Sequence, residues 1–159
     1  MTDGSNRSPA SDSVAATLET IRKSLDEHPD RDARLRGVVR LISASRPYYS
    51  WTGIYLLEAG MLVLHNQIGP ATPHERIPIG QGICVLAARE RRSVVVPDVT
   101  RDPRYLACSL ATRSEIVVPI MRGPEVLGEI DVDSDRLDAF GDGDRLLLEG
   151  TAALVADLI

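Results

Sequence analysis

The sequence has few of the residue types that mark several common protein classes. Its 159 residues include two cysteines, one tryptophan and one phenylalanine. No apolar run approaches the roughly 20 residues needed to cross a bilayer. The N-terminus also lacks the charged and then apolar segments of a secretory signal. We therefore expect a cytoplasmic protein that has no membrane partner.

Charge and short motifs exclude further classes. The formal net charge is -5 and the basic residues are scattered, which argues against a nucleic-acid partner. The Gly80 and Gly82 pair lacks the third glycine of a dinucleotide-binding fingerprint, and no Walker sequence, His-Glu-x-x-His motif or nucleophile elbow occurs. The cysteines and histidines lack metal-site spacing. We therefore expect no cofactor and no metal.

Each cysteine is interpreted either as a small core residue or as a reactive thiol, because two cysteines in a reducing cytoplasm do not form a disulfide framework. Cys84 opens a predicted helix, where the helix dipole favours a thiolate, yet its apolar neighbours equally fit a core position. Cys108 lies in a loop beside Ala107 and Ser109, which packing explains less easily. Cys108 is therefore the preferred reactive thiol.

The length suits a single domain, so we assign residues 1–13 to a disordered leader and residues 14–159 to one domain. Helical spacing of apolar residues predicts a helix from an N-cap at Ser13 to His28, another between Asp30 and Pro47, a short one ending near Arg91, and a last one over 142–159. Strands are predicted at 49–57, 61–64, 76–79, 93–96, 114–121 and 125–133, with loops at 67–75 and 97–113. This order indicates an α+β domain with a mostly antiparallel sheet.

Strand alternation places Glu129, Asp131 and Asp133 on one face of the sheet, opposite Ile130 and Val132. An acidic face is either simply solvated or a binding site, and both interpretations stay open. Trp51 and Tyr55 are also co-facial with each other and are costly to expose. A carboxylate cluster binds an ammonium group, and crowding raises the proton affinity of its members. A protonated member would donate a hydrogen bond to a substrate oxygen.

Short segments along most of the chain match a known pattern in order and with compatible spacing. They are Trp51-Thr-Gly-Ile-Tyr55, Arg76-Ile-Pro, Gly80-Gln-Gly-Ile-Cys84, Pro97-Asp-Val, Ala107-Cys108, Ser114-Glu115-Ile-Val-Val-Pro119, Gly128-Glu-Ile-Asp131-Val-Asp133-Ser134 and 140–148. In these segments the chain resembles a GAF domain and, more narrowly, the free methionine-(R)-sulfoxide reductases. The resemblance implies a GAF-type fold, with a central, mostly antiparallel sheet and N- and C-terminal helices packed on one face.

The narrower resemblance implies a thiol reaction that reduces free methionine-(R)-sulfoxide to methionine through a sulfenic acid and a disulfide. It also implies thioredoxin or another thiol as reductant, and a possible homodimer through the terminal helices. Carried over by position, Cys108 is the nucleophile, Cys84 is the resolving thiol, Glu115, Asp131 and Asp133 bind and polarise the sulfoxide, and Trp51 and Tyr55 surround the thioether methyl.

Two features depart from the reductase pattern. Reductases commonly carry a further cysteine before Arg-Ile-Pro, where this chain has His74. The segment Asp102-Pro-Arg-Tyr-Leu106 resembles ligand-sensing GAF domains rather than reductases. The alternative function is therefore a stand-alone GAF sensor that binds a small ligand without turning it over.

Overall fold

The computed structural model describes residues 9–80, 82–106 and 109–159. The elements in chain order are α1 (Pro9–Glu27), α2 (Arg31–Ser45), β1 (Trp51–Glu58), β2 (Met61–Ile68), β3 (Arg76–Pro78), α3 (Gly82–Glu90), β4 (Val94–Val96), the 3-10 helix η1 (Val99–Arg101), β5 (Ser114–Arg122), β6 (Glu125–Ser134) and α4 (Asp142–Ala156).

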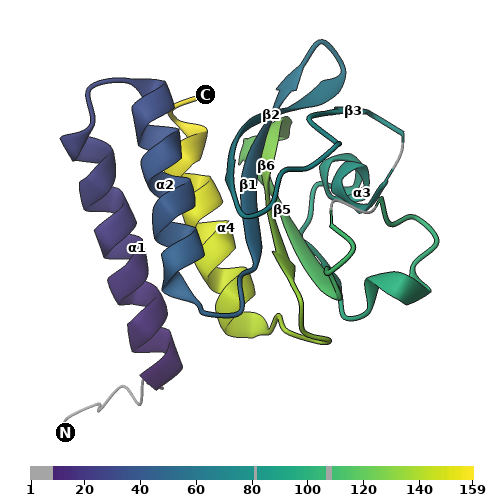
Figure 1. Cartoon of the computed structure of the whole chain (residues 1–159). Helices are drawn as coiled ribbons and strands as arrows, with labels where there is room; N and C mark the ends of the chain where they lie inside the picture. The colour runs from purple at the N-terminus through teal and green to yellow at the C-terminus, as the bar shows by residue number, and fades with distance from the viewer. Residues whose placement is uncertain (1–8, 81, 107–108) are drawn as a thin grey trace, which may run out of the picture.

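The strands form one six-stranded sheet in the order β3-β2-β1-β6-β5-β4, and every neighbouring pair is antiparallel. Tight turns join β1 to β2 and β5 to β6, and their glycines Gly60 and Gly123 have positive φ values of 78° and 56°. Glycine adopts this left-handed conformation without the clash that a Cβ atom causes. The first and last long strands, β1 and β6, thereby meet in the middle of the sheet, as Figure 1 shows.

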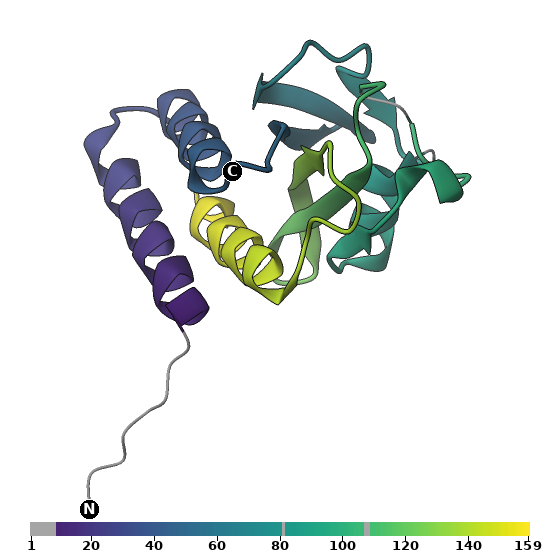
Figure 2. The same ribbon diagram turned by 60° about the horizontal axis from the view of Figure 1, so that its bottom comes forward.

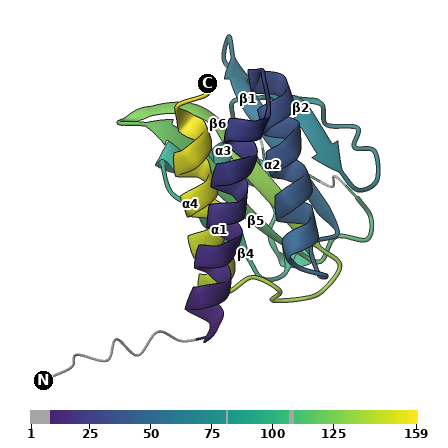
Figure 3. The same cartoon turned by 90° about the vertical axis from the view of Figure 1, so that its left-hand side faces the viewer.

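One face of the sheet is covered by helices. Helices α2 and α4 pack directly on it, and α1 lies outside them as a further layer, in front of both in Figure 3 and most distant from the strands in Figure 2. The core on this side is aliphatic and includes Ile42, Ile54, Ile130, Val132 and Leu147, each 0% exposed. Burial of each such side chain stabilises the fold by about 1.5–3 kcal/mol.

Helix α3 and the connections around it cover the opposite face (Figure 1). A second cluster of buried side chains lies there, with Trp51, Tyr55, Cys84 and Val117 among its members. Unlike the helix-covered core, this region also holds the four buried acidic side chains of β5 and β6. The functional residues expected from the sequence gather on this side.

The predicted fold class is confirmed, and the main differences lie at element boundaries. Helix α1 begins at Pro9, so Ser13 lies inside the helix and its carbonyl accepts a hydrogen bond from Thr17. Strand β2 continues to Ile68, because residues predicted as loop pair with β1 beyond a bulge at Ile54. Residues 1–8, which belong to the predicted leader, lie outside the described residues. No described helix is both long enough and apolar enough to span a membrane.

Candidate functional site

Four carboxyl side chains lie under α3 on the sheet face that the helices α2 and α4 leave uncovered. Glu115 comes from β5, and Glu129, Asp131 and Asp133 come from β6. Glu115 is 2% exposed and the other three are 0% exposed. The alternation expected from the sequence is therefore confirmed, but the acidic face is not solvated. We call these four side chains the carboxyl cluster.

The register of three central strands sets the layout of the carboxyl cluster. Asp133 pairs with Glu115 on one side and with Trp51 on the other. Asp131, two residues before Asp133 on β6, pairs with Gly53. Glu129, two residues before Asp131, pairs with Tyr55. Paired residues and residues two apart point to the same face of a sheet. The acids and the two aromatic side chains therefore occupy one contiguous surface.

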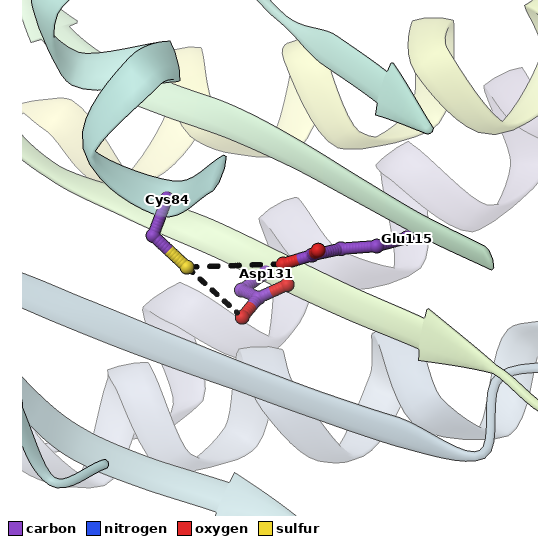
Figure 4. A group of neighbouring side chains, drawn as sticks. All are labelled: Cys84, Glu115 and Asp131. Atoms are coloured by element: carbon purple, nitrogen blue, oxygen red, sulfur yellow. Dashed lines mark hydrogen bonds between the residues drawn. The ribbon is translucent and has the colours of Figure 1, made fainter. Parts of the chain in front are cut away.

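Cys84 is brought onto this surface by the first turn of α3. Its Sγ lies 3.6 Å from Asp131 Oδ2 and 3.8 Å from Glu115 Oε1, as drawn in Figure 4. The side chain is 5% exposed. The three ligand-type atoms of Cys84, Glu115 and Asp131 all lie within 4.8 Å of one another. A thiol does face carboxyl groups, as the sequence suggested, and the thiol seen there is that of Cys84.

Several oxygen atoms of the carboxyl cluster have no hydrogen-bond partner among the described residues. They are Glu115 Oε2, Glu129 Oε1 and Oε2, Asp131 Oδ1 and Asp133 Oδ1. Asp133 is partly satisfied, because the Thr112 hydroxyl donates to its Oδ2 at 3.1 Å. Buried polar groups in native proteins are normally hydrogen-bonded, and exceptions call for a ligand or another explanation. The cluster is therefore suited to bind a polar molecule or a cation.

Burial controls the protonation of the carboxyl cluster. It raises the pKa of Asp131 to about 7, while contacts with Glu115 and Cys84 act in the opposite direction. Burial and the charges of Asp131 and Asp133 hold the pKa of Glu115 well above its usual value. Burial and then Asp131 do the same to the pKa of Glu129 and of Asp133. A desolvated carboxyl group favours its neutral form, so these acids retain protons that can be donated.

Trp51 and Tyr55 connect the carboxyl cluster to the loop between β2 and β3. The indole Nε1 donates to the Pro70 carbonyl at 3.0 Å, and the Tyr55 hydroxyl donates to the His74 carbonyl at 2.9 Å. The two ring centroids are 6.4 Å apart. These bonds satisfy the polar ends of both rings and leave their apolar surfaces to line the site.

Gly53 allows the Trp51 ring to lie close to the sheet. A Cβ atom built at Gly53 would come within 2.4 Å of the indole. Only glycine leaves room for the ring at this position, which pairs directly with Asp131. The Trp51-Thr-Gly sequence thus places an aromatic surface beside the central acid.

The structure brings together most of the residues that the sequence indicated. Cys84, Glu115, Asp131 and Asp133 form one site with the aromatic side chains of β1. The proposed nucleophile, Cys108, lies outside the described residues. Sequence reasoning placed Glu129 on the correct face but gave it no role, although its alternation with Asp131 carried the signal.

A cavity of about 430 Å³ lies on the outer side of α3. Its lining includes Leu86 and Arg89 of the helix and Arg104 and Tyr105 of the loop that leads toward Cys108. None of the four acids lines this cavity.

Comparisons with known proteins agree with the fold. The chain is 38% identical over 132 residues to GAF domain-containing protein A of Dictyostelium discoideum, covering 82% of each chain. A solved type II free methionine-R-sulfoxide reductase from Thermoplasma acidophilum is 37% identical, with a TM-score of 0.77, and the match covers 89% of this chain and 94% of that one. The Neisseria meningitidis free methionine-R-sulfoxide reductase, solved with its substrate, is 31% identical, with a TM-score of 0.86 and coverage of 97% and 92%.

The family match extends over most of the described structure. The profile of the GAF domain family matches residues 30–159, from the start of α2 to the end of the chain. This range contains the whole sheet, helix α3 and every residue of the carboxyl cluster. The chain therefore belongs to the GAF domain family.

Proposed function

We propose that this protein reduces free methionine-(R)-sulfoxide to methionine with a cysteine thiol. The observation that carries the proposal is the buried Cys84 thiol against Glu115 and Asp131, in a cluster with unpartnered carboxyl oxygens. Similarity to several free methionine-R-sulfoxide reductases, two of them solved with substrate, supports the same activity.

In this proposal the carboxyl cluster binds the polar groups of the substrate. Glu115, Asp131 and Asp133 contact the sulfoxide oxygen and the ammonium group. Asp131 has a pKa raised by burial to about 7, so near neutral pH it exists in both protonation states. Its protonated form donates a hydrogen bond to the sulfoxide oxygen and makes the sulfur more electrophilic.

The aromatic side chains select the apolar part of the substrate. Trp51 and Tyr55 are held by hydrogen bonds to the 69–75 loop, so their rings have fixed positions beside the cluster. We assign them to the thioether methyl group, which packs favourably on aromatic surfaces. A fixed aromatic wall also favours one configuration at the sulfoxide sulfur, since exchanging the oxygen and methyl positions would place the oxygen against the rings.

The proposed reaction passes the sulfoxide oxygen to a cysteine. The Cys108 thiolate attacks the sulfur while the cluster protonates the sulfoxide oxygen. Collapse of this adduct releases methionine and leaves Cys108 as a sulfenic acid, so methionine sulfoxide is reduced and the cysteine is oxidised by two electrons. The Cys84 thiol then condenses with the sulfenic acid, which forms a disulfide and releases water. Thioredoxin or another thiol reductant restores both thiols.

A ligand-sensing function is the alternative, and one feature of the structure favours it. Asp102 and Arg104 form an ion pair at 2.6 Å in the loop beside the cavity outside α3. These residues belong to the segment that resembles sensing GAF domains. In that case the same acids would bind a small ligand without turnover.

Methionine release from free methionine sulfoxide tests the proposal. We expect the wild type to convert the R isomer in the presence of thioredoxin or dithiothreitol, and to leave the S isomer and peptide-bound sulfoxide unchanged. Cys108→Ser should be inactive, and Cys84→Ser should lose turnover with thioredoxin. Absence of activity in the wild type, with tight and thiol-independent binding of an amino acid in calorimetry, would favour the sensor.

Homodimerisation through the terminal helices stays a prediction. The apolar face of α4 that suggested it is used within the chain, because Leu147, Thr151 and Val155 are each 0% exposed. A dimer would therefore have to use other surfaces of these helices. Sedimentation of the full chain measures the oligomeric state directly.

A further inference from the structure

We propose that Cys84, Glu115 and Asp131 form a binding site for one divalent transition-metal ion, for which Zn²⁺ is the best fit. The inference goes beyond the proposed reductase function. It depends only on the arrangement of these three side chains, drawn in Figure 4, and can be measured without turnover.

The spacing of the sulfur and oxygen atoms matches zinc coordination. In a tetrahedral site, Zn–S bonds of about 2.3 Å and Zn–O bonds of about 2.0–2.2 Å place sulfur and oxygen about 3.5–3.7 Å apart. The Cys84 Sγ atom lies 3.6 Å from Asp131 Oδ2 and 3.8 Å from Glu115 Oε1. The sulfur atom thus already lies close to the required separation from both oxygen donors, and all three donor atoms lie within 4.8 Å of one another.

A second observation points to a missing ligand at the same place. Asp131 Oδ1, Glu115 Oε2 and both oxygens of Glu129 are buried without a hydrogen-bond partner among the described residues. Glu129 is 0% exposed and lies on the same face of β6 as Asp131, two residues away. Burying several ionised carboxyl groups together is energetically costly, and a bound cation would compensate their negative charge.

The donor set selects among divalent metals. One thiolate with two carboxylates suits Zn²⁺ and its substitute Co²⁺. Mg²⁺ and Ca²⁺ prefer six or more oxygen ligands and gain little from sulfur. As the metal binds, the Cys84 thiol and any coordinating carboxyl group that is protonated release their protons to solvent, and no atom changes oxidation state.

Metal binding would oppose the proposed reaction. The ion would occupy the same oxygen atoms that are proposed to bind methionine sulfoxide, and it would hold the sulfur of the resolving cysteine. Zinc and substrate are therefore expected to exclude each other.

Co²⁺ titration of the reduced full-length protein tests the proposal. Thiolate coordination gives a sulfur-to-cobalt charge-transfer band in the near ultraviolet. We expect a band that saturates at one equivalent and disappears when Zn²⁺ is added. The Cys108→Ser protein keeps only Cys84 and should show the same band, whereas Cys84→Ser should show none. Absence of the band from both the wild type and Cys108→Ser, or its persistence in Cys84→Ser, would overturn the site.

A matched pair of β6 variants tests the carboxylate ligand. Asp131→Asn should weaken Co²⁺ binding at least about tenfold. Asp133→Asn changes a buried acid on the same strand and face, but one whose Oδ2 accepts from Thr112, and should leave affinity within about threefold. Circular dichroism confirms that both variants are folded. Wild-type affinity in folded Asp131→Asn would overturn the assignment. Because no substrate is present, neither result depends on whether the protein is a reductase.

Discussion

Strand β6 presents alternate residues to two faces of one sheet, and both sets are buried. Toward α2 and α4 it presents Ile130 and Val132, and toward α3 it presents Glu129, Asp131 and Asp133, all 0% exposed. Burial alone therefore does not distinguish a core from a site. The difference lies in chemistry. Apolar side chains on one face pack against one another, whereas the acids on the other face leave oxygens without hydrogen-bond partners in the part of the chain that the structure describes.

Asp144 shows that a buried acid need not be a functional one. At the start of α4 its Oδ1 accepts hydrogen bonds from the Tyr48 and Tyr49 hydroxyls at 2.7 and 2.6 Å, and its Oδ2 accepts from the Gly141 backbone N–H at 2.9 Å. Both oxygens are satisfied, because the two tyrosines join α4 to the chain before β1 and the Gly141 N–H belongs to the N-cap of α4 itself. The unsatisfied acids under α3 are the ones expected to bind a ligand.

The largest expected effect is a loss of activity without a loss of stability when an acid of the carboxyl cluster is replaced. Asp131→Asn should lower kcat/KM for methionine sulfoxide by about 100-fold or more, since it removes a proton donor to the sulfoxide oxygen. The free energy of unfolding should stay unchanged or increase, because an amide costs less to bury than a carboxylate. Steady-state kinetics and urea unfolding of the same preparation measure both. Activity within a few fold of wild type would remove Asp131 from the proposed mechanism.

The adjacent residue on β6 should behave in the opposite way. Ile130→Ala leaves a cavity in the helix-covered core and should lower the free energy of unfolding by about 3 kcal/mol. Its side chain does not face the carboxyl cluster, so activity per folded molecule should change little. Urea unfolding with activity assays at low temperature checks the prediction. A variant that is fully stable but inactive would contradict the division between the two faces.

The protonated carboxyl cluster should leave a signature in the pH dependence of stability. The pKa of Asp131 is raised by burial to about 7, against about 3.9 in an unfolded chain. Above pH 4 the unfolded state therefore binds fewer protons at this residue than the folded state, and stability falls as pH rises. The wild type should lose stability relative to Asp131→Asn between about pH 4 and 7. The free energy of unfolding of both proteins is measured by urea unfolding without metal across this pH range. Parallel pH profiles of the two proteins would show that Asp131 is ionised in the folded state.

The smallest effect on stability is expected from removing a hydrogen bond to Asp144, the acid on the helix-covered side whose oxygens both have partners. Tyr49→Phe removes one hydrogen bond to Asp144 and should lower the free energy of unfolding by about 1.5 kcal/mol. Tyr48→Phe is the matched control, because its hydroxyl donates to the same oxygen from a more exposed position, and its effect should be smaller. Neither variant should alter kcat/KM. A large loss of activity in Tyr49→Phe would show that the two faces are coupled.

Much of this arrangement could be predicted from the sequence because it depends on strand alternation. Period-two spacing placed Glu129, Asp131 and Asp133 on one face, and apolar spacing predicted α2 and α4 closely. Alternation could not show that the acidic face is buried, because that depends on α3 folding over it. The contact of Cys84 with Asp131 likewise joins residues distant in sequence, so no local pattern reveals it.

The boundaries that were mispredicted have local physical causes. Residues 67 and 68 were assigned to a loop because Gly69, Pro70 and Pro73 follow them, yet pairing with β1 across a bulge keeps residues up to Ile68 in the sheet. Ser13 is a good N-cap by type, but the helix extends to Pro9. The assignment of residues 14–159 to a single domain and the roles of Cys84 and Cys108 stay predictions.

Single-turnover release of methionine tests the central claim most directly. The reduced protein is mixed with excess free methionine-(R)-sulfoxide without any external reductant, and both released methionine and remaining thiols are counted. The account predicts one methionine per chain from the wild type, with loss of both thiols, and none from Cys108→Ser. Release of no methionine by the wild type, or equal release by Cys108→Ser, would contradict it.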